Sequence, residues 1–216
     1  MERKDRLIWL DNLRCIAMFV VVMGHVYMGA TPDTLRYYIY SFHMPLFFAI
    51  SGAGYYLQTS RREYSFAEML KNKSRGILLP YFVFSMLNIP ILIIMDYLRV
   101  GHSNKDVSEL IIATLYANLD YKSMPTGPLW FCLVLFLTTI LFYFIRKICK
   151  NDLVMAVVTV AIGFSGYLVT QHFSSIIYPW YSNTTFIAVI FFMLGYLFIK
   201  YISHVQKVMG SIKRQV

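Results

Sequence analysis

The sequence predicts an all-α, polytopic membrane protein with about six transmembrane helices. Hydrophobic residues make up 58% of the 216 residues and charged residues only 14%, whereas soluble domains carry about 25% charged residues. Six stretches approach the roughly 20 mostly apolar residues that a spanning helix needs. This composition argues against a soluble globular domain, a disordered chain and a disulfide-rich secreted module. The six stretches are residues 8–29, 38–58, 77–98, 128–147, 153–171 and 180–200.

Basic residues between these stretches predict the orientation. Fifteen Lys and Arg residues fall in the two termini and in the connections after the second and fourth stretches, against four in the other connections. Connections rich in Lys and Arg stay in the cytoplasm. We therefore expect both termini on the cytoplasmic side of the cell (plasma) membrane. The excess of 20 basic over 11 acidic residues is explained by this topology, so no nucleic-acid partner is expected.

Three connecting segments have patterns of their own. Residues 106–119 carry apolar side chains at helical spacing after a possible cap at Asp106 or Ser108, which predicts a short amphipathic helix at the outer interface. The run MPTGP at 124–128 predicts a break in the chain before the fourth span. KNKSRGILLPY, residues 71–81, is expected to be a cytoplasmic loop leading into the third span.

The first stretch holds three ionisable residues, Asp11, Arg14 and His25, on one narrow helical face beside Met18 and Val22. A charge inside a bilayer costs at least about 2.5–3.5 kcal/mol, so such residues usually face a partner or a wet cavity. Asp11 and Arg14 are spaced to form an ion pair. The alternative is structural: the charged pair reaches the cytoplasmic interface and His25 lies at the outer one.

The second stretch contains SFHMPLFFAISG. His43 is expected near the depth of His25, because the connection between the two helices is short. Ser51 and Gly52 are expected near the depth of Arg14, about 10 Å from the cytoplasmic end. Gly52 and Gly54 have an alternative role, since small residues let membrane helices approach closely.

Three further residues are candidates for substrate binding. Lys73 and Arg75 lie at the predicted cytoplasmic mouth of the third helix, where they would suit an anion such as a phosphate. Positive-inside topology explains them equally well. Trp130 opens the fourth span, where an aromatic belt residue is also expected. Cys15, Cys132 and Cys149 show no metal spacing and are expected to be small buried hydrophobes.

Four segments in order, WLDNLRCIAMFVVVMGH, SFHMPLFFAISG, KSRGILLPY and GPLWF, resemble membrane acyltransferase family 3 and its branch of fucose 4-O-acetylase-like proteins. Arg14, ten residues and His25 match the family's R-x10-H motif, and FFAISG matches its FFxxSG element. The resemblance covers about residues 7–200. The family's cytoplasmic loop often carries Arg-x-x-Arg, which Lys73 and Arg75 only approximate. Family members have about ten spans, so residues 1–216 are expected to be a single integral-membrane domain corresponding to the amino-terminal part of that unit.

The resemblance implies a membrane-bound O-acyltransferase. Such an enzyme moves an acetyl or other acyl group from cytoplasmic acyl-CoA to a hydroxyl of a carbohydrate or cell-surface glycan. It implies catalytic roles for His25 and Arg14, with acetyl-CoA as a donor substrate and no permanently bound cofactor or metal. The expected partners are the lipid bilayer, acyl-CoA and the glycan acceptor.

Two other classes remain open on the residues alone. A small transporter would also explain charge within the membrane, but the fourth span has no ionisable residue in its apolar core to match those of the first, as related transporter halves would. A non-catalytic membrane subunit is the second alternative.

Overall fold

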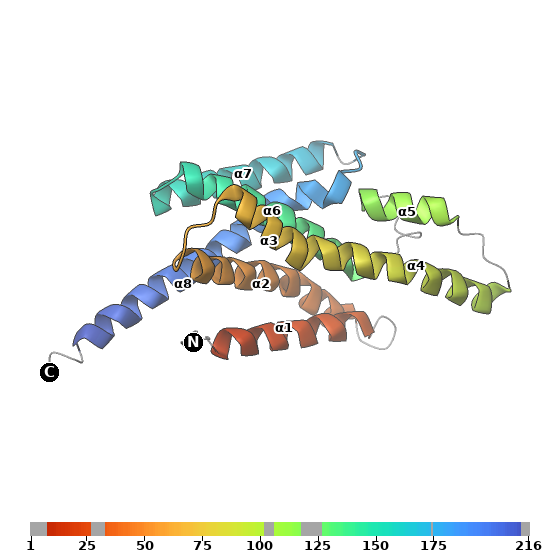
Figure 1. Ribbon diagram of the computed structural model, residues 1–216, viewed down its shortest axis with the longest axis horizontal. Coiled ribbons are helices and arrows are strands. Elements are labelled where there is room, and N and C mark those ends of the chain that lie inside the picture. Colours follow the sequence, from red (N-terminus) through yellow and green to blue (C-terminus); the bar gives the residue numbers. More distant parts are fainter. Residues whose placement is uncertain (1–7, 27–32, 102–105, 118–126, 174, 213–216) are drawn as a thin grey trace. The chain divides into compact units, whose positions relative to one another are not determined.

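The computed structural model describes residues 8–26, 33–101, 106–117, 127–173 and 175–212, and every regular element within them is helical (Figure 1). A helix occupies each of the six stretches predicted as spans, which confirms the all-α class. The helices are α1 (Ile8–Val26), α2 (Asp33–Thr59), α3 (Phe66–Lys73), α4 (Leu79–Val100), α5 (Val107–Tyr116), α6 (Trp130–Ile148), α7 (Asp152–His172) and α8 (Ser182–Ile212).

Four helical segments in the described residues are long and apolar enough to cross a membrane, and they establish a membrane protein. They are Phe66–Val100, Gly127–Ile148, Asp152–His172 and Pro179–Ile202. The two remaining predicted spans, α1 and α2, carry more polar sequence, including Asp11 and Arg14 in α1. The count of six spans therefore stays a prediction.

Helical contacts divide the chain into two compact units. The first comprises residues 1–63 and the chain from Phe191 onward, and the second comprises Tyr64–Ile190. α8 thus begins in the second unit and continues into the first.

In the first unit, α1 and α2 lie side by side and antiparallel (Figure 1). Leu10 and Ala17 of α1 pack with Ile50 and Ala53 of α2 and with Ile199 of α8 in one buried cluster. These residues recur at helical spacing on α1, so the face of α1 that meets its neighbours is apolar.

The crossing of α2 and α8 in this unit depends on two glycines. A Cβ added at Gly52 would overlap the carbonyl oxygen of Phe192, and one added at Gly195 would overlap that of Ala49. The two backbones therefore approach more closely than any residue with a side chain allows. The packing role that the sequence left open for Gly52 is confirmed.

In the second unit, Tyr81 of α4 lies fully buried with Ala117 and Leu133. Its hydroxyl donates a 2.8 Å hydrogen bond to the carbonyl oxygen of Thr114. The short helix predicted within residues 106–119 is present as α5, and the Asp106 side chain caps it by accepting from the backbone N–H of Ser108. This part of the prediction is confirmed.

A tight turn precedes α8. Trp180 and Tyr181 adopt φ values of 54° and 51°, in the left-handed region that side-chain-bearing residues rarely occupy. The indole N–H of Trp180 donates a 2.7 Å hydrogen bond to the carbonyl oxygen of Leu115. This bond ties the turn to the end of α5 and helps to offset its backbone strain.

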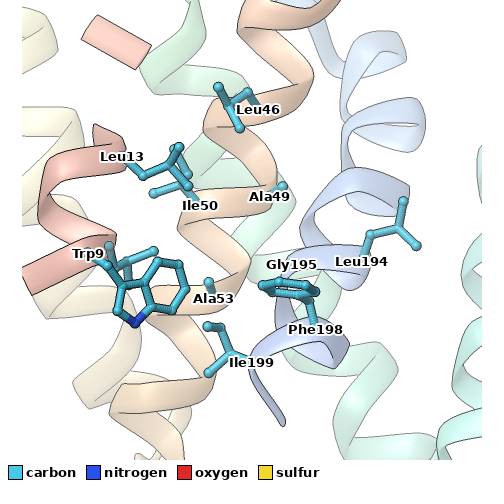
Figure 2. Close-up of a pocket in the computed structure, with 11 residues that line it drawn as sticks. Trp9, Leu13, Leu46, Ala49, Ile50, Ala53, Leu194, Gly195, Phe198 and Ile199 are labelled. Carbon is cyan, nitrogen blue, oxygen red and sulfur yellow. The ribbon is translucent and has the colours of Figure 1, made fainter. Parts of the chain in front are cut away.

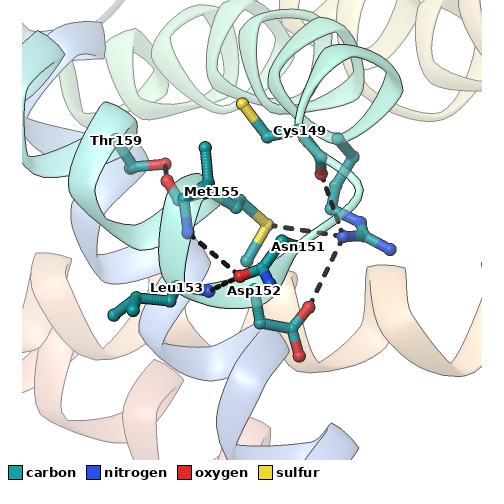
Figure 3. A network of polar contacts seen from close by, with 8 residues as sticks. Cys149, Asn151, Asp152, Leu153, Met155 and Thr159 are labelled. Atoms are coloured by element: carbon teal, nitrogen blue, oxygen red, sulfur yellow. Dashed lines mark hydrogen bonds and ion pairs between the residues drawn. The ribbon is translucent and has the colours of Figure 1, made fainter.

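Arg146 holds the turn between α6 and α7, where Cys149, Asn151 and Asp152 lie in a network of polar contacts (Figure 3). Its guanidinium lies 3.5 Å from the Asp152 carboxylate and donates a 3.3 Å hydrogen bond to the carbonyl oxygen of Cys149. Asn151 caps α7 by accepting from the backbone N–H groups of Leu153 and Val154.

All three cysteines carry free thiols. Cys149 is buried as predicted, whereas Cys15 is exposed on α1, so the prediction of burial was wrong there.

Candidate active site

The predicted ion pair is present at the start of α1. Arg14 Nη1 donates a 2.9 Å hydrogen bond to Asp11 Oδ1, and the two side chains remain 46% and 25% exposed. One helical turn separates the residues, so the pair forms within α1 itself. The carboxylate thereby orients a guanidinium that is still accessible to a ligand.

Arg14 also reaches across to α2. A Cβ added at Gly54 would lie 2.9 Å from Arg14 Nη2, so the guanidinium occupies space that only a glycine leaves free. The middle of the predicted polar face, at Met18 and Val22, is exposed in the described part of the chain. The two ends of this face are thus the parts that contact α2.

At the other end of α1, His25 and His43 come together as predicted. Their ring centroids lie 6.5 Å apart, and Tyr40 adds a third ring 5.8 Å from His25 and 5.0 Å from His43. His43 is buried and His25 is half-buried. The Tyr40 hydroxyl donates a long, 3.4 Å hydrogen bond to the carbonyl oxygen of Gly24, which joins the two helices at this point.

The hydrogen bonds of the two imidazoles fix their tautomers. Nδ1 of His25 lies 2.8 Å from the carbonyl oxygen of Val21, and Nδ1 of His43 lies 2.8 Å from that of Ile39. A carbonyl oxygen only accepts, so Nδ1 carries the hydrogen in each ring. In a neutral imidazole this leaves the Nε2 lone pair available, and no described residue donates a hydrogen bond to it in either ring. His25 therefore presents a basic nitrogen.

The remaining candidates on α2 lie between these two ends. Gly52 is buried against the backbone of α8, and Ser51 beside it is half-buried. Their predicted part in substrate binding stays a prediction, because the close helix crossing accounts for Gly52.

Lys73 and Arg75 lie on a helix, so the loop predicted over residues 71–81 was wrong. α3 starts at a capping box in which Ser65 and Glu68 satisfy each other's backbone N–H groups. It continues into α4 through a π-helical turn, Ser74–Leu78. Pro80 has no N–H for an ordinary helical bond, and the wider turn before it lets the helix continue. Arg75 is exposed and Lys73 is half-buried.

Trp130 begins α6 and is half-buried, with its ring 5.5 Å from that of Tyr181. Lys73, Arg75 and Trp130 belong to the second unit, whereas Asp11, Arg14, His25, His43, Ser51 and Gly52 belong to the first. The structure thus brings together the candidates from α1 and α2. Whether the other three join them stays a prediction.

One neighbour of the imidazoles was missed. Tyr40 contacts both rings, yet the sequence analysis did not single it out. The signal was its spacing, because a residue three positions before His43 lies on the same side of a helix. Tyrosines are frequent in this chain, so this spacing alone did not mark Tyr40.

Comparison with protein families gives one match. The family model described as an acyltransferase domain, that of acyltransferase family 3, matches residues 7–212 and so nearly the whole chain. The match includes both α1 and α2, with the Asp11–Arg14 pair and the two imidazoles. No curated protein and no solved structure gives a significant match.

Proposed function

We propose, because the chain belongs to acyltransferase family 3, that it is a membrane-bound O-acyltransferase acting on a carbohydrate. In this proposal the donor is cytoplasmic acyl-CoA, with acetyl-CoA as the first candidate. The acceptor is a hydroxyl of a carbohydrate or cell-surface glycan. The enzyme is proposed to act in the plasma membrane with both termini in the cytoplasm, and to belong to the branch of fucose 4-O-acetylase-like proteins.

The observation that carries this proposal is the hydrogen bonding of His25. Its Nδ1 is held by the carbonyl oxygen of Val21, which leaves Nε2 as a proton acceptor. A general base near neutral pH suits hydroxyl acylation, because an alcohol is a poor nucleophile until its proton is removed.

In the proposed reaction, Nε2 of His25 takes the proton of the acceptor hydroxyl as its oxygen attacks the thioester carbonyl carbon. The tetrahedral intermediate then collapses, the carbon–sulfur bond breaks, and the imidazolium returns the proton to the departing thiolate. The products are an ester and free CoA. His43 and Tyr40 surround the ring of His25 and help to fix its orientation.

On the donor side, two separate candidates for binding the phosphates of acyl-CoA are proposed, Lys73 with Arg75 in the second unit and Arg14 in the first. The exposed guanidinium of Arg14 is oriented for this by Asp11. His25 lies eleven positions after Arg14, or about 16 Å along the helix. The extended pantetheine arm of acyl-CoA is suited to cross this distance, so that the phosphates stay near Arg14 while the thioester reaches His25.

His43, Ser51, Gly52 and Trp130 complete the proposed substrate-binding set. Trp130 has a partly exposed aromatic ring beside that of Tyr181, which suits the apolar face of a sugar. His43 is buried beside His25, so its proposed part in substrate binding is to position that imidazole.

The test is acyl transfer by the purified chain in nanodiscs. The protein is given radiolabelled acetyl-CoA and a mixture of cell-surface glycans, and the release of CoA thiol is followed with and without acceptor. We expect release that depends on the acceptor and that His25→Gln loses. Equal, acceptor-independent release by both proteins would overturn the proposal.

A further inference from the structure

A pocket of about 370 Å³ lies wholly within the first unit, between α1, α2 and the part of α8 that follows Phe191. Figure 2 shows Trp9 on the α1 side, Leu46 and Ala49 on α2, and Phe198 on α8 around this space. Ligand pockets in proteins range from about 300 to 1,000 Å³, so its size is that of a binding site rather than a packing defect.

The lining of this pocket is almost entirely hydrocarbon. It has no charged side chain, and its one polar side-chain group is the indole N–H of Trp9. A buried water needs two to four polar partners, which these walls do not supply. Left empty, the walls would forfeit their dispersion contacts across the space. The chemistry of the pocket therefore favours an apolar occupant.

The surroundings of the pocket indicate which apolar molecule is available. The α8 residues that line it belong to Pro179–Ile202, a segment long and apolar enough to cross a membrane. Leu194 and Phe198 on this side are 51% and 56% exposed. Exposed apolar side chains within a spanning segment face the hydrocarbon of the bilayer, which consists mainly of the acyl chains of phospholipids.

We propose that this pocket binds one acyl chain of a bilayer phospholipid. The chain is held and not consumed, so the site goes beyond the acyl transfer proposed above and does not depend on it. The donor is a poorer occupant, because the phosphates of acyl-CoA require Arg or Lys and the lining offers neither.

Trp9 provides the reporter for a binding experiment. In a chain carrying Trp130→Phe and Trp180→Phe, Trp9 is the remaining tryptophan. The purified protein in detergent micelles is titrated with phosphatidylcholine brominated on its acyl chains, which quenches indole fluorescence on contact. We expect quenching that saturates. Competing lysophosphatidylcholines should displace the brominated lipid more effectively as their chains lengthen, until the pocket is full, because a longer chain makes more dispersion contacts with its walls.

Two single variants test the location. Ala49→Phe places a ring in the pocket and should weaken the saturable binding about tenfold or more, because the ring takes up space that the acyl chain needs. Ile16→Phe is the matched control, because Ile16 is 59% exposed on α1 and outside the pocket lining. It should leave the binding unchanged. If Ala49→Phe does not fold, Phe198→Ala at the exposed rim takes its place and should also weaken binding.

The unmodified chain gives an independent readout, since native mass spectrometry counts the phospholipids that stay bound after detergent purification. We expect one tightly held phospholipid in the wild type and in Ile16→Phe, and a loss of it in Ala49→Phe. Quenching that rises with lipid without saturating would overturn the proposal, because it indicates ordinary lipid contact. Saturation by acyl-CoA or a polyprenyl phosphate but not by phospholipid would also overturn it, because the pocket would then be a substrate site.

Discussion

His25 and His43 lie edge to face with their ring centroids 6.5 Å apart, and each ring is anchored through Nδ1 to the carbonyl oxygen one turn earlier on its own helix. Each imidazole is thus oriented locally, by the helix that carries it. The packing of α1 against α2 then sets the distance between the two rings and adds the contacts of His43 and Tyr40 with the ring of His25.

The first prediction concerns His25 as the general base. A positioned base contributes typically 10²–10⁴-fold in rate, so His25→Ala should lower acyl transfer by about that factor. His25→Gln should fail as well, because an amide cannot take up the proton. The measurement is the transfer rate in nanodiscs at matched protein levels, with acyl-CoA binding retained. His172→Gln, at an exposed position at the end of α7, is the control and should keep full activity. Near wild-type transfer by His25→Gln would leave the imidazole with a packing role.

The second prediction concerns Arg75 as a ligand for the donor's phosphates. A hydrogen bond to a charged group contributes about 1.5–3 kcal/mol, so Arg75→Ala should weaken acyl-CoA binding roughly tenfold to a hundredfold. Arg75→Lys should restore it only in part, since the planar fork is lost. Calorimetric titration checks both variants, with Lys147→Ala, also exposed and basic, as the control. An unchanged affinity for acyl-CoA in Arg75→Ala would contradict this prediction and leave Arg75 with a role only in setting the orientation of the chain in the membrane.

Much of the fold was predictable because long apolar runs in a sequence indicate membrane helices. The positions of the six helices predicted as spans followed from such runs, and the Asp11–Arg14 pair followed from spacing within one helix. The helical state of Lys73 and Arg75 was missed, because a polar stretch before a proline resembles a loop unless a π-helical turn is anticipated. The crossing at Gly52 and Gly195 was predictable only in part. A glycine in a membrane helix indicates that another helix packs closely there, but the sequence does not show which helix that is.

The third prediction tests the orientation deduced from the basic residues. Reporter fusions at Lys122 and Lys213, two positions outside the described residues, should report the outer and the cytoplasmic side respectively. An alkaline phosphatase fusion is active outside and a fluorescent protein is active inside, so the two reporters provide opposite signals at each position. A cytoplasmic signal from Lys122 would contradict the arrangement with both termini inside.

The fourth prediction concerns pH and the start of α5. Hydrogen bonds from the Ser108 side chain and backbone lower the pKa of the Asp106 carboxyl below its ordinary value. A group with a lowered folded pKa stabilises the fold above its unfolded pKa, and this contribution is lost as pH falls through the folded value. Amide exchange in α5 should therefore speed up, relative to other helices, as pH falls below about 4. Asp106→Asn still caps the helix and should remove this pH dependence.

The last prediction compares two glycines that lie two positions apart on α2. A Cβ at Gly52 would overlap backbone atoms of Phe192, which cannot move without separating the helices. A Cβ at Gly54 would meet only the end of the Arg14 side chain, which is long and flexible. Alanine raises helix propensity by about 0.8–1 kcal/mol at either position. Overpacking costs about 1–3 kcal/mol or more, and at Gly52 it should exceed that gain.

Gly52→Ala should therefore lower the unfolding temperature in detergent, whereas Gly54→Ala should leave it unchanged or raise it. Gly54→Ala should instead change the binding of acyl-CoA. The added methyl group displaces the guanidinium of Arg14 from its place against α2, while its bond to Asp11 remains. We expect Gly54→Ala to bind acyl-CoA more weakly and to keep its full thermal stability. A glycine with a purely structural role would not lose binding while keeping stability. If both variants melt at the wild-type temperature, the conclusion that the backbones of α2 and α8 approach closely at Gly52 is wrong. If Gly54→Ala binds acyl-CoA normally, the position of Arg14 against α2 has no part in donor recognition.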